Sequence, residues 1–239
     1  MDYGKWLQEQ VKSWGMELTP EQLKQFALYY ERLVQVNQKM NLTAITSEKD
    51  VYIKHFYDSL TLASQKWWGQ VESVIDVGTG AGFPGVPLKI AFPRLRLVMV
   101  DSLKKRIGFL QDLTDELGLQ HVETIHGRAE EVARQTRYRD QFDLATARAV
   151  ARLNVLSEYC LPFVRPGGKF AAMKGPDAGT EVDEGKQAIE KLGGGSVESV
   201  HLMLPDEMGT RQIIIVSKSR STPKRFPRKP GIPGRKPLA

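Results

Sequence analysis

Between residues 71 and 173 short apolar runs alternate with helical stretches, and no other feature of the sequence constrains the fold as strongly. The expected strands are residues 71–77, 95–101, 122–126, 142–146 and 168–173. The expected helices lie near residues 86–91, 103–117, 130–136 and 151–159. Strands that alternate with helices form a parallel sheet covered on both faces. The sequence therefore predicts a doubly wound α/β domain.

Two further apolar segments, residues 197–204 and 212–217, are joined only by residues 205–209. A loop of this length permits a hairpin but not the longer crossover that connects parallel strands. We therefore expect a mostly parallel sheet of seven strands with an antiparallel last strand.

The N-terminal part has helical patterning. Thr19 can cap a helix, Pro20 suits its first turn, and Gln22 completes a capping box. Apolar residues then recur at helical spacing, at Leu23, Phe26, Ala27, Tyr30, Leu33 and Val34, and a second helix is expected from residue 48 to about residue 64. The sequence thus predicts an N-terminal helical cap over residues 1–68, the α/β domain over residues 69–217 and a tail over residues 218–239.

The basic residues are concentrated in the tail. Of the 34 basic and 28 acidic residues, eight basic and no acidic residues lie between Lys218 and Ala239, which leaves 26 basic residues against 28 acidic ones elsewhere. Five prolines disfavour a helix or a central strand there. An extended basic arm suits an RNA backbone, with contacts expected from Arg225, Arg228 and Lys229; a solvated end that aids solubility is the alternative.

Other compositional features exclude several classes of protein. The single cysteine, Cys160, permits neither an internal disulfide nor a cysteine-rich zinc cage, so no metal is expected. The first residues lack a signal-peptide pattern, and the longest aliphatic run, residues 213–216, is too short to cross a membrane. We expect a cytoplasmic monomer without membrane contact.

The turn after the first expected strand holds four glycines, and two kinds of cofactor compete for it. Gly80, Gly82 and Gly85 formally match the dinucleotide fingerprint, whereas Asp76 followed by Gly78, Gly80 and Gly82 matches the pattern of S-adenosylmethionine-dependent methyltransferases. A carboxylate at this position would repel a pyrophosphate and attract an ammonium and a sulfonium. The sequence therefore favours S-adenosylmethionine, and the antiparallel end of the sheet is typical of the Rossmann-like methyltransferases that bind it.

Further donor-binding candidates lie at the same edge of the sheet. Thr79 belongs to the glycine loop, and Asp101 is expected to accept the ribose hydroxyls, to cap the following helix, or both. Ala129 is expected to present its backbone N–H to adenine, with Glu130 accepting from the exocyclic amine. An ordinary acid in the first turn of a helix is the alternative for Glu130.

The loop after the fourth strand, residues 145–152, normally faces the methyl acceptor. It lacks the Asn/Asp-Pro-Pro-aromatic run used for exocyclic amines, and no Pro-Cys pair supports attack on cytosine C5. A ring nitrogen such as guanine N7 has an available lone pair, so its methylation requires alignment and no general base. Arg148 is expected to orient the donor or the guanine, with a salt bridge as the alternative. Lys174 is expected to contact RNA phosphate.

His55 and Asp58 are spaced by three residues on a predicted helix and therefore share a face. They are candidates to line the donor or RNA pocket. A lone helical histidine is more often structural, and this is the preferred interpretation.

Several short motifs occur in a fixed order along nearly the whole chain. They are Asn41-Leu42-Thr43-Ala44-Ile45, His55…Asp58-Ser59-Leu60, the loop of residues 78–85, Arg128-Ala129-Glu130, Ala147-Arg148-Ala149 and Arg225-Phe226-Pro227-Arg228-Lys229-Pro230-Gly231. Together they resemble the glucose-inhibited division protein B family. This resemblance implies a bacterial methyltransferase that acts on N7 of a guanine in small-subunit (16S) ribosomal RNA, as naked RNA or as part of the small ribosomal subunit. It also implies donor binding by Gly78, Phe83, Ala129, Glu130 and Arg148.

Two alternatives remain open at this point. One is a nucleotide-dependent oxidoreductase that uses the same glycine loop. The other is a non-catalytic RNA-binding protein, such as a ribosome assembly factor, that has kept the fold.

Overall fold

The computed structural model describes residues 1–148, 151–176 and 179–238. A seven-stranded sheet of order β3-β2-β1-β4-β5-β7-β6 lies at its centre. The strands are β1 (Ser73–Val77), β2 (Arg96–Asp101), β3 (Val122–His126), β4 (Phe142–Arg148), β5 (Val164–Lys174), β6 (Gly194–Met203) and β7 (Thr210–Lys218). β1 to β5 pair in parallel, whereas β7 is antiparallel to both β5 and β6. The predicted fold class is confirmed.

Helices cover both faces of the sheet because alternate residues of each strand face opposite sides. Val74 of β1 packs with α5 (Gly85–Ala91), α6 (Lys104–Glu116) and the N-terminal helices. Its neighbour Ile75 packs on the other face, in the cluster that includes residues of α8 and α9. The helices of this second face are α7 (Ala129–Val132), α8 (Leu153–Cys160) and α9 (Gly179–Lys191), with the 3-10 turn η4 (Leu161–Phe163) after α8.

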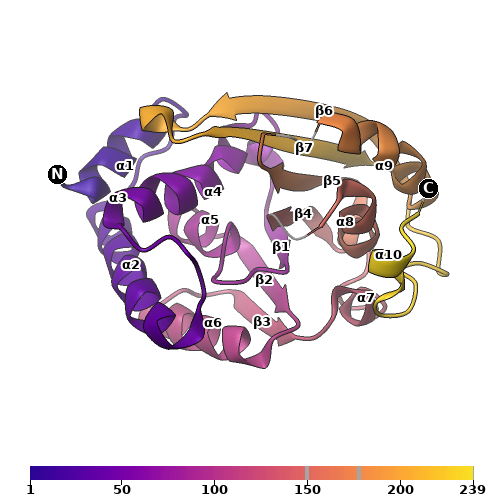
Figure 1. The fold of residues 1–239 in the computed structure, drawn as a ribbon, viewed down its shortest axis with the longest axis horizontal. Coiled ribbons are helices and arrows are strands. Elements are labelled where there is room, and N and C mark those ends of the chain that lie inside the picture. Colours follow the sequence, from indigo (N-terminus) through magenta and orange to yellow (C-terminus); the bar gives the residue numbers. More distant parts are fainter. Residues whose placement is uncertain (149–150, 177–178, 239) are drawn as a thin grey trace.

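The N-terminal helices lie at one end of the molecule (Figure 1). They are α1 (Tyr3–Lys12), α2 (Pro20–Met40), α3 (Glu48–Val51), the π-helix η1 (Tyr52–Tyr57), α4 (Asp58–Leu60) and the 3-10 turns η2 (Thr61–Ser64) and η3 (Trp68–Gln70). The capping box at Thr19 and Gln22 forms as predicted. Phe26 and Tyr29 of α2 pack against Phe56 of η1 in tilted pairs with ring centroids 5.1 Å apart, which fixes η1 against α2.

The single helix expected over residues 48–64 is wrong in detail, because four short segments form instead. The hydroxyl of Ser59 donates to the carbonyl oxygen of His55 at 2.5 Å, and that of Thr61 donates to the carbonyl oxygen of Asp58 at 2.5 Å. Side-chain hydroxyls that bond backward in this way compete with the regular helical ladder.

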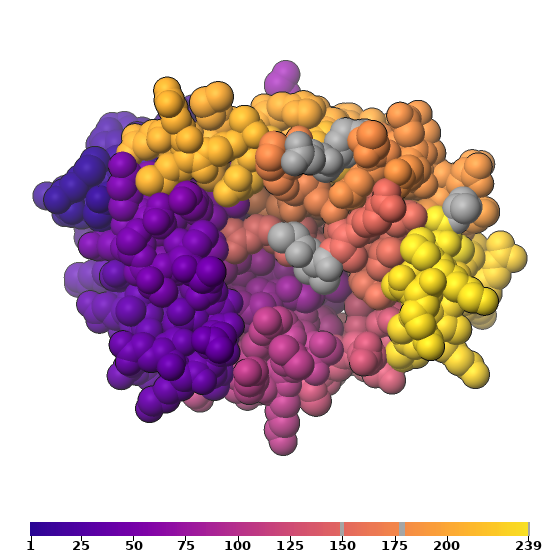
Figure 2. Space-filling model, in the orientation of Figure 1, coloured from indigo at the N-terminus to yellow at the C-terminus, as the bar shows by residue number. Residues whose placement is uncertain are grey.

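The tail also differs from the extended arm that its composition predicted. After β7 the chain folds back onto the body and ends in α10 (Ile232–Arg235), with Pro233 in the first turn of that helix, where proline is tolerated. Arg139 donates to the carbonyl oxygens of Thr222, Pro223 and Phe226 at 2.7–3.2 Å. Figure 2 shows this segment in yellow, packed against the molecule.

The 3-10 turn η5 (Pro205–Glu207) joins β6 to β7 in the predicted hairpin. Among the helices of the described residues, none combines the length and the apolar character that a membrane span requires.

Candidate active site

The carboxyl ends of β1 to β4 border a crevice made of two adjoining cavities. The larger cavity, about 370 Å³, is lined by the glycine loop, by the end of β4 and by cap residues that include Thr43 and His55. The smaller cavity, about 150 Å³, is lined by residues at the ends of β2 and β3 and by Tyr159 of α8. Gly78 and Asp101 line both cavities, so the two are parts of one crevice.

The glycine loop has a backbone shape that other residues rarely adopt. Gly78, Gly80 and Gly82 have φ values of 71°, 61° and 102°. A Cβ atom on Gly82 would lie only 2.7 Å from a methyl carbon of Val86 and 2.8 Å from the hydroxyl of Tyr29. A Cβ atom on Gly80, by contrast, would have no neighbour closer than 4.0 Å. The loop is therefore tightly packed against the protein interior at Gly82 and has open space for a ligand at Gly80.

Asp76 holds this loop from inside the protein. Its side chain is fully buried, and its Oδ2 accepts from the hydroxyl of Thr79 at 2.7 Å and from the backbone N–H of Gly85 at 2.9 Å. Burial raises the pKa of its carboxyl group to about 6. Asp76 does not line the crevice, so the structure gives it a different role from the direct attraction of a cationic ligand that the sequence suggested.

Asp101 ties the glycine loop to β2. Its Oδ1 accepts from the backbone N–H of Leu103 at 2.9 Å; Leu103 is itself the N-cap residue of α6, which has no side-chain cap, so the capping role expected for Asp101 is wrong. Its Oδ2 accepts from the backbone N–H of Gly80 at 3.0 Å and faces Arg106 Nη1 at 3.4 Å. The carboxylate lies where both cavities meet, and its contact with a ribose remains a prediction.

Ala129 and Glu130 line the smaller cavity together, next to Tyr159. Glu130 is buried, and its Oε1 accepts from the backbone N–H of Gly231 at 2.9 Å. The folded tail therefore supports this end of the crevice. Sequence patterns did not predict this contact, because no local signal links Glu130 to a residue 101 positions away.

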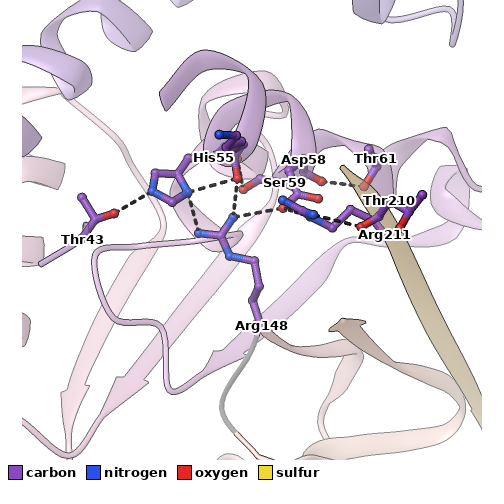
Figure 3. Close-up of polar contacts among 9 residues, drawn as sticks. Thr43, His55, Asp58, Ser59, Thr61, Arg148, Thr210 and Arg211 are labelled. Atoms are coloured by element: carbon purple, nitrogen blue, oxygen red, sulfur yellow. Dashed lines mark hydrogen bonds and ion pairs between the residues drawn. The ribbon is translucent and has the colours of Figure 1, made fainter. Parts of the chain in front are cut away.

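Arg148 and the cap form the opposite wall (Figure 3). The guanidinium carbon of Arg148 lies 4.7 Å from the ring centroid of Phe83, and the ring of His55 stacks on Phe83 at 4.4 Å. Arg148 also donates to the carboxylate of Asp58 at 3.4 Å and to Nδ1 of His55 at 3.2 Å. The structure thus joins the predicted Arg148 and Phe83 to Asp58 and to His55, for which the sequence favoured a structural role. Ala149, the last residue of the Ala147-Arg148-Ala149 motif, lies outside the described residues.

Both ring nitrogens of His55 have polar neighbours. Nδ1 lies 3.2 Å from Nη2 of Arg148 and 3.1 Å from the carbonyl oxygen of Lys54, and Nε2 lies 2.9 Å from the hydroxyl of Thr43. Burial, followed by the nearby charge of Arg148, lowers the pKa of His55 to about 3. His55 is therefore a neutral ring with both nitrogens engaged.

The four basic residues predicted to contact RNA have different environments. Lys174 bonds to the carbonyl of Ala151 and pairs with Glu181 at 2.8 Å, and Arg228 pairs with a fully buried Glu158 at 2.6 Å. Both cations therefore have protein partners. Arg225 and Lys229 are exposed. Contact of any of the four with RNA remains a prediction.

Within the described residues, no group of three or more His, Cys, Asp or Glu side chains has the arrangement of a metal site. The crevice groups that could bind a small molecule are the backbone of the glycine loop, the carboxylates of Asp101 and Glu130, and the guanidinium of Arg148.

Solved structures with this fold include two enzymes crystallised with the methyl donor or its product. An O-methyltransferase from Bacillus cereus in complex with SAH aligns with a TM-score of 0.56 at 19% identity, over 80% of this chain and 90% of its own. The O-methyltransferase TomG from Streptomyces achromogenes, in complex with SAM, aligns with a TM-score of 0.54 at 17% identity, over 80% and 89% of the two chains. These similarities support the fold.

Sequence comparison gives the family. The profile described as rRNA small subunit methyltransferase G matches residues 22–213. The ribosomal RNA small subunit methyltransferase G of Exiguobacterium sibiricum is 54% identical over 224 residues, which cover 94% of each chain. The protein of the same name from Macrococcus caseolyticus is 52% identical over 238 residues, 100% of this chain and 99% of its own. These matches confirm the resemblance found in the motifs, and the chain belongs to the rRNA small subunit methyltransferase G (GidB) family.

Proposed function

We propose that this protein transfers a methyl group from S-adenosylmethionine to N7 of a guanine in small-subunit (16S) ribosomal RNA. The observation that carries the proposal is the crevice wall of Phe83, His55 and Arg148, which offers no group free to accept a proton. Guanine N7 attacks through its own lone pair, so this wall needs only to align the two reactants.

The crevice fits S-adenosylmethionine. Gly80 has space for a ligand against its backbone, the Asp101 carboxylate lies where the two cavities meet, and the Arg148 guanidinium lines the larger cavity. A carboxylate suits the ribose hydroxyls of such a ligand, and a guanidinium suits its carboxylate. When bound, S-adenosylmethionine supplies an activated methyl group on a sulfonium.

We assign the ends of the crevice as follows. The donor contacts the glycine loop at Gly78, Thr79, Gly80 and Phe83, while Gly82 gives the loop its shape from the packed side. Ala129 and Glu130 hold the adenine. Asp101 accepts from the ribose hydroxyls. Arg148 binds the carboxylate of the methionine portion and excludes water from the face of Phe83.

The partner is ribosomal RNA, held in part by the exposed Arg225 and Lys229. Their cations suit phosphate, and the affinity for RNA should fall steeply with salt. Because the substrate is a ribosomal component, we place the enzyme in the cytoplasm, and we propose that it acts as a monomer.

The test is transfer of a radiolabelled methyl group from S-adenosylmethionine to naked ribosomal RNA and to small ribosomal subunits, both from a strain that lacks the modification. The proposal predicts label in small-subunit RNA, and a preference for subunits would identify a folded particle as substrate. Donor binding without transfer to either acceptor would indicate a non-catalytic RNA-binding protein. Binding of a nicotinamide dinucleotide in place of the methyl donor would indicate an oxidoreductase.

A further inference from the structure

Asp58 is shared by two arginines from distant parts of the chain (Figure 3). Its Oδ2 accepts from Nη1 of Arg148 at 3.4 Å and from Nε of Arg211 at 3.2 Å. The Asp58 side chain is only 4% exposed, whereas those of Arg148 and Arg211 are 16% and 23% exposed. Arg211 lies on β7, and no motif of the sequence identified it.

These groups are not electrically balanced. His55 is neutral, so two guanidinium cations face one carboxylate in direct contact with them. Asp76 lies near enough to influence Arg148, although its own hydrogen bonds go to Thr79 and Gly85. Without Arg211, the Asp58 carboxylate would have Arg148 as its remaining ion-pair partner among the described residues.

Arg148 is the member of this group that reaches the crevice. It lines the larger cavity, whereas Asp58 and Arg211 do not. When a carboxylate pairs with a single arginine, it cancels most of that arginine's attraction for another anion. When the carboxylate is shared with a second arginine, each arginine keeps more of its attraction for another anion.

We propose that Arg211 is a positioning residue for Arg148: by sharing Asp58, it leaves the Arg148 guanidinium positively charged towards the carboxylate of the methyl donor. This inference rests on the proposed function of the crevice and extends it to a residue outside the crevice. Arg211 acts through Asp58 and touches no reacting atom.

The competing explanation is that Arg211 only fastens the β6–β7 hairpin to the N-terminal helices. The chain provides a matched control, because Lys49 of α3 pairs with Asp206 of η5 at 2.8 Å and joins the same two parts. These side chains are 43% and 48% exposed, and neither contacts Asp58. Lys49→Gln therefore removes a fastening contact and leaves the charge around Arg148 intact.

The experiment is calorimetric titration of the full chain with S-adenosylhomocysteine and with its decarboxylated analogue, which lacks only the carboxylate. Arg211→Gln should weaken binding of S-adenosylhomocysteine about tenfold, the order expected for one unit charge at a partly buried site. It should not weaken binding of the decarboxylated analogue. Arg211→Lys, which keeps the charge, should recover part of the loss. Lys49→Gln should change neither affinity.

Three results would overturn the role of Arg211 and leave the proposed function intact. Arg211→Gln could weaken the binding of both ligands equally, or weaken neither. Lys49→Gln could also weaken S-adenosylhomocysteine selectively, as expected only for Arg211→Gln. Wild-type protein that binds neither ligand would refute the donor site and this inference together. Normal binding with no methyl transfer to RNA would refute only the proposed function.

Discussion

Replacing Arg228 with alanine tests whether the tail is part of the folded structure. Arg228 donates to the Glu158 carboxylate through Nε at 2.9 and 3.0 Å and through Nη2 at 2.6 Å. Glu158 is fully buried. Among the described residues, the substitution would leave its carboxylate with the backbone N–H of residue 228, at 2.7 Å, as its one remaining donor.

Removing one partner of a buried ion pair costs about 3–5 kcal/mol, because the remaining charge stays buried. The tail can limit this cost by detaching and admitting water to Glu158, so we expect the lower end of the range. For a chain of this size, about 3 kcal/mol corresponds to a fall in Tm of roughly 6–12 °C.

The assay is thermal unfolding followed by circular dichroism, together with the rate of trypsin cleavage after Lys224 and Arg225. Arg228→Ala should lower the Tm and accelerate cleavage. Lys229→Ala removes the adjacent exposed cation and is the matched control, which should leave both values near wild type. If Arg228→Ala and Lys229→Ala behave alike, the tail is not held by Glu158 and the reasoning is wrong.

Three other predictions concern the crevice. Arg148→Ala should reduce methyl transfer about a hundredfold through lost alignment, and lower the Tm only slightly, because Arg211 still neutralises Asp58; a variant that simply unfolds would contradict this role. Gly82→Ala should destabilise the protein by about 2 kcal/mol or more and abolish donor binding, since its Cβ would meet Val86 and Tyr29 within 3 Å at a φ of 102°; unchanged denaturant unfolding and donor titration would disprove the packing argument. The pKa of His55, about 3, lies below its ordinary 6.5, so the stability that its neutral form contributes is present above pH 6.5 and is lost as the pH falls towards 3; ring NMR signals that titrate between pH 5 and 8 would show that its contact with Arg148 is absent.

The strands and the order of helices were predictable because their signals are local. Apolar alternation, the Thr19 capping box and the short 205–209 loop each depend on residues within a few positions. The division of residues 48–64 into four short segments was harder to predict. Ser59 and Thr61 are compatible with a regular helix unless their hydroxyls bond to the carbonyl oxygens of His55 and Asp58.

The tail was predicted least well, and the reason is physical. Proline and basic residues indicate an extended, solvated segment when only neighbours in sequence are considered. Arg139, Glu158 and Glu130 provide its partners, and they lie 70 to 101 residues away. For the candidate site, the glycine loop and Arg148 carry sequence patterns, whereas Arg211 carries none and is brought in by strand pairing.

The most direct test of the central claim is the identity of the methylated nucleoside. Small ribosomal subunits from an unmodified strain would be incubated with the enzyme and labelled S-adenosylmethionine, and their RNA digested to nucleosides and separated by chromatography. We expect label in 7-methylguanosine, because N7 is the guanine position that reacts without loss of a proton. Label in a guanosine methylated at N1 or at the exocyclic amine, either of which must lose a proton, would contradict a crevice wall that offers no base.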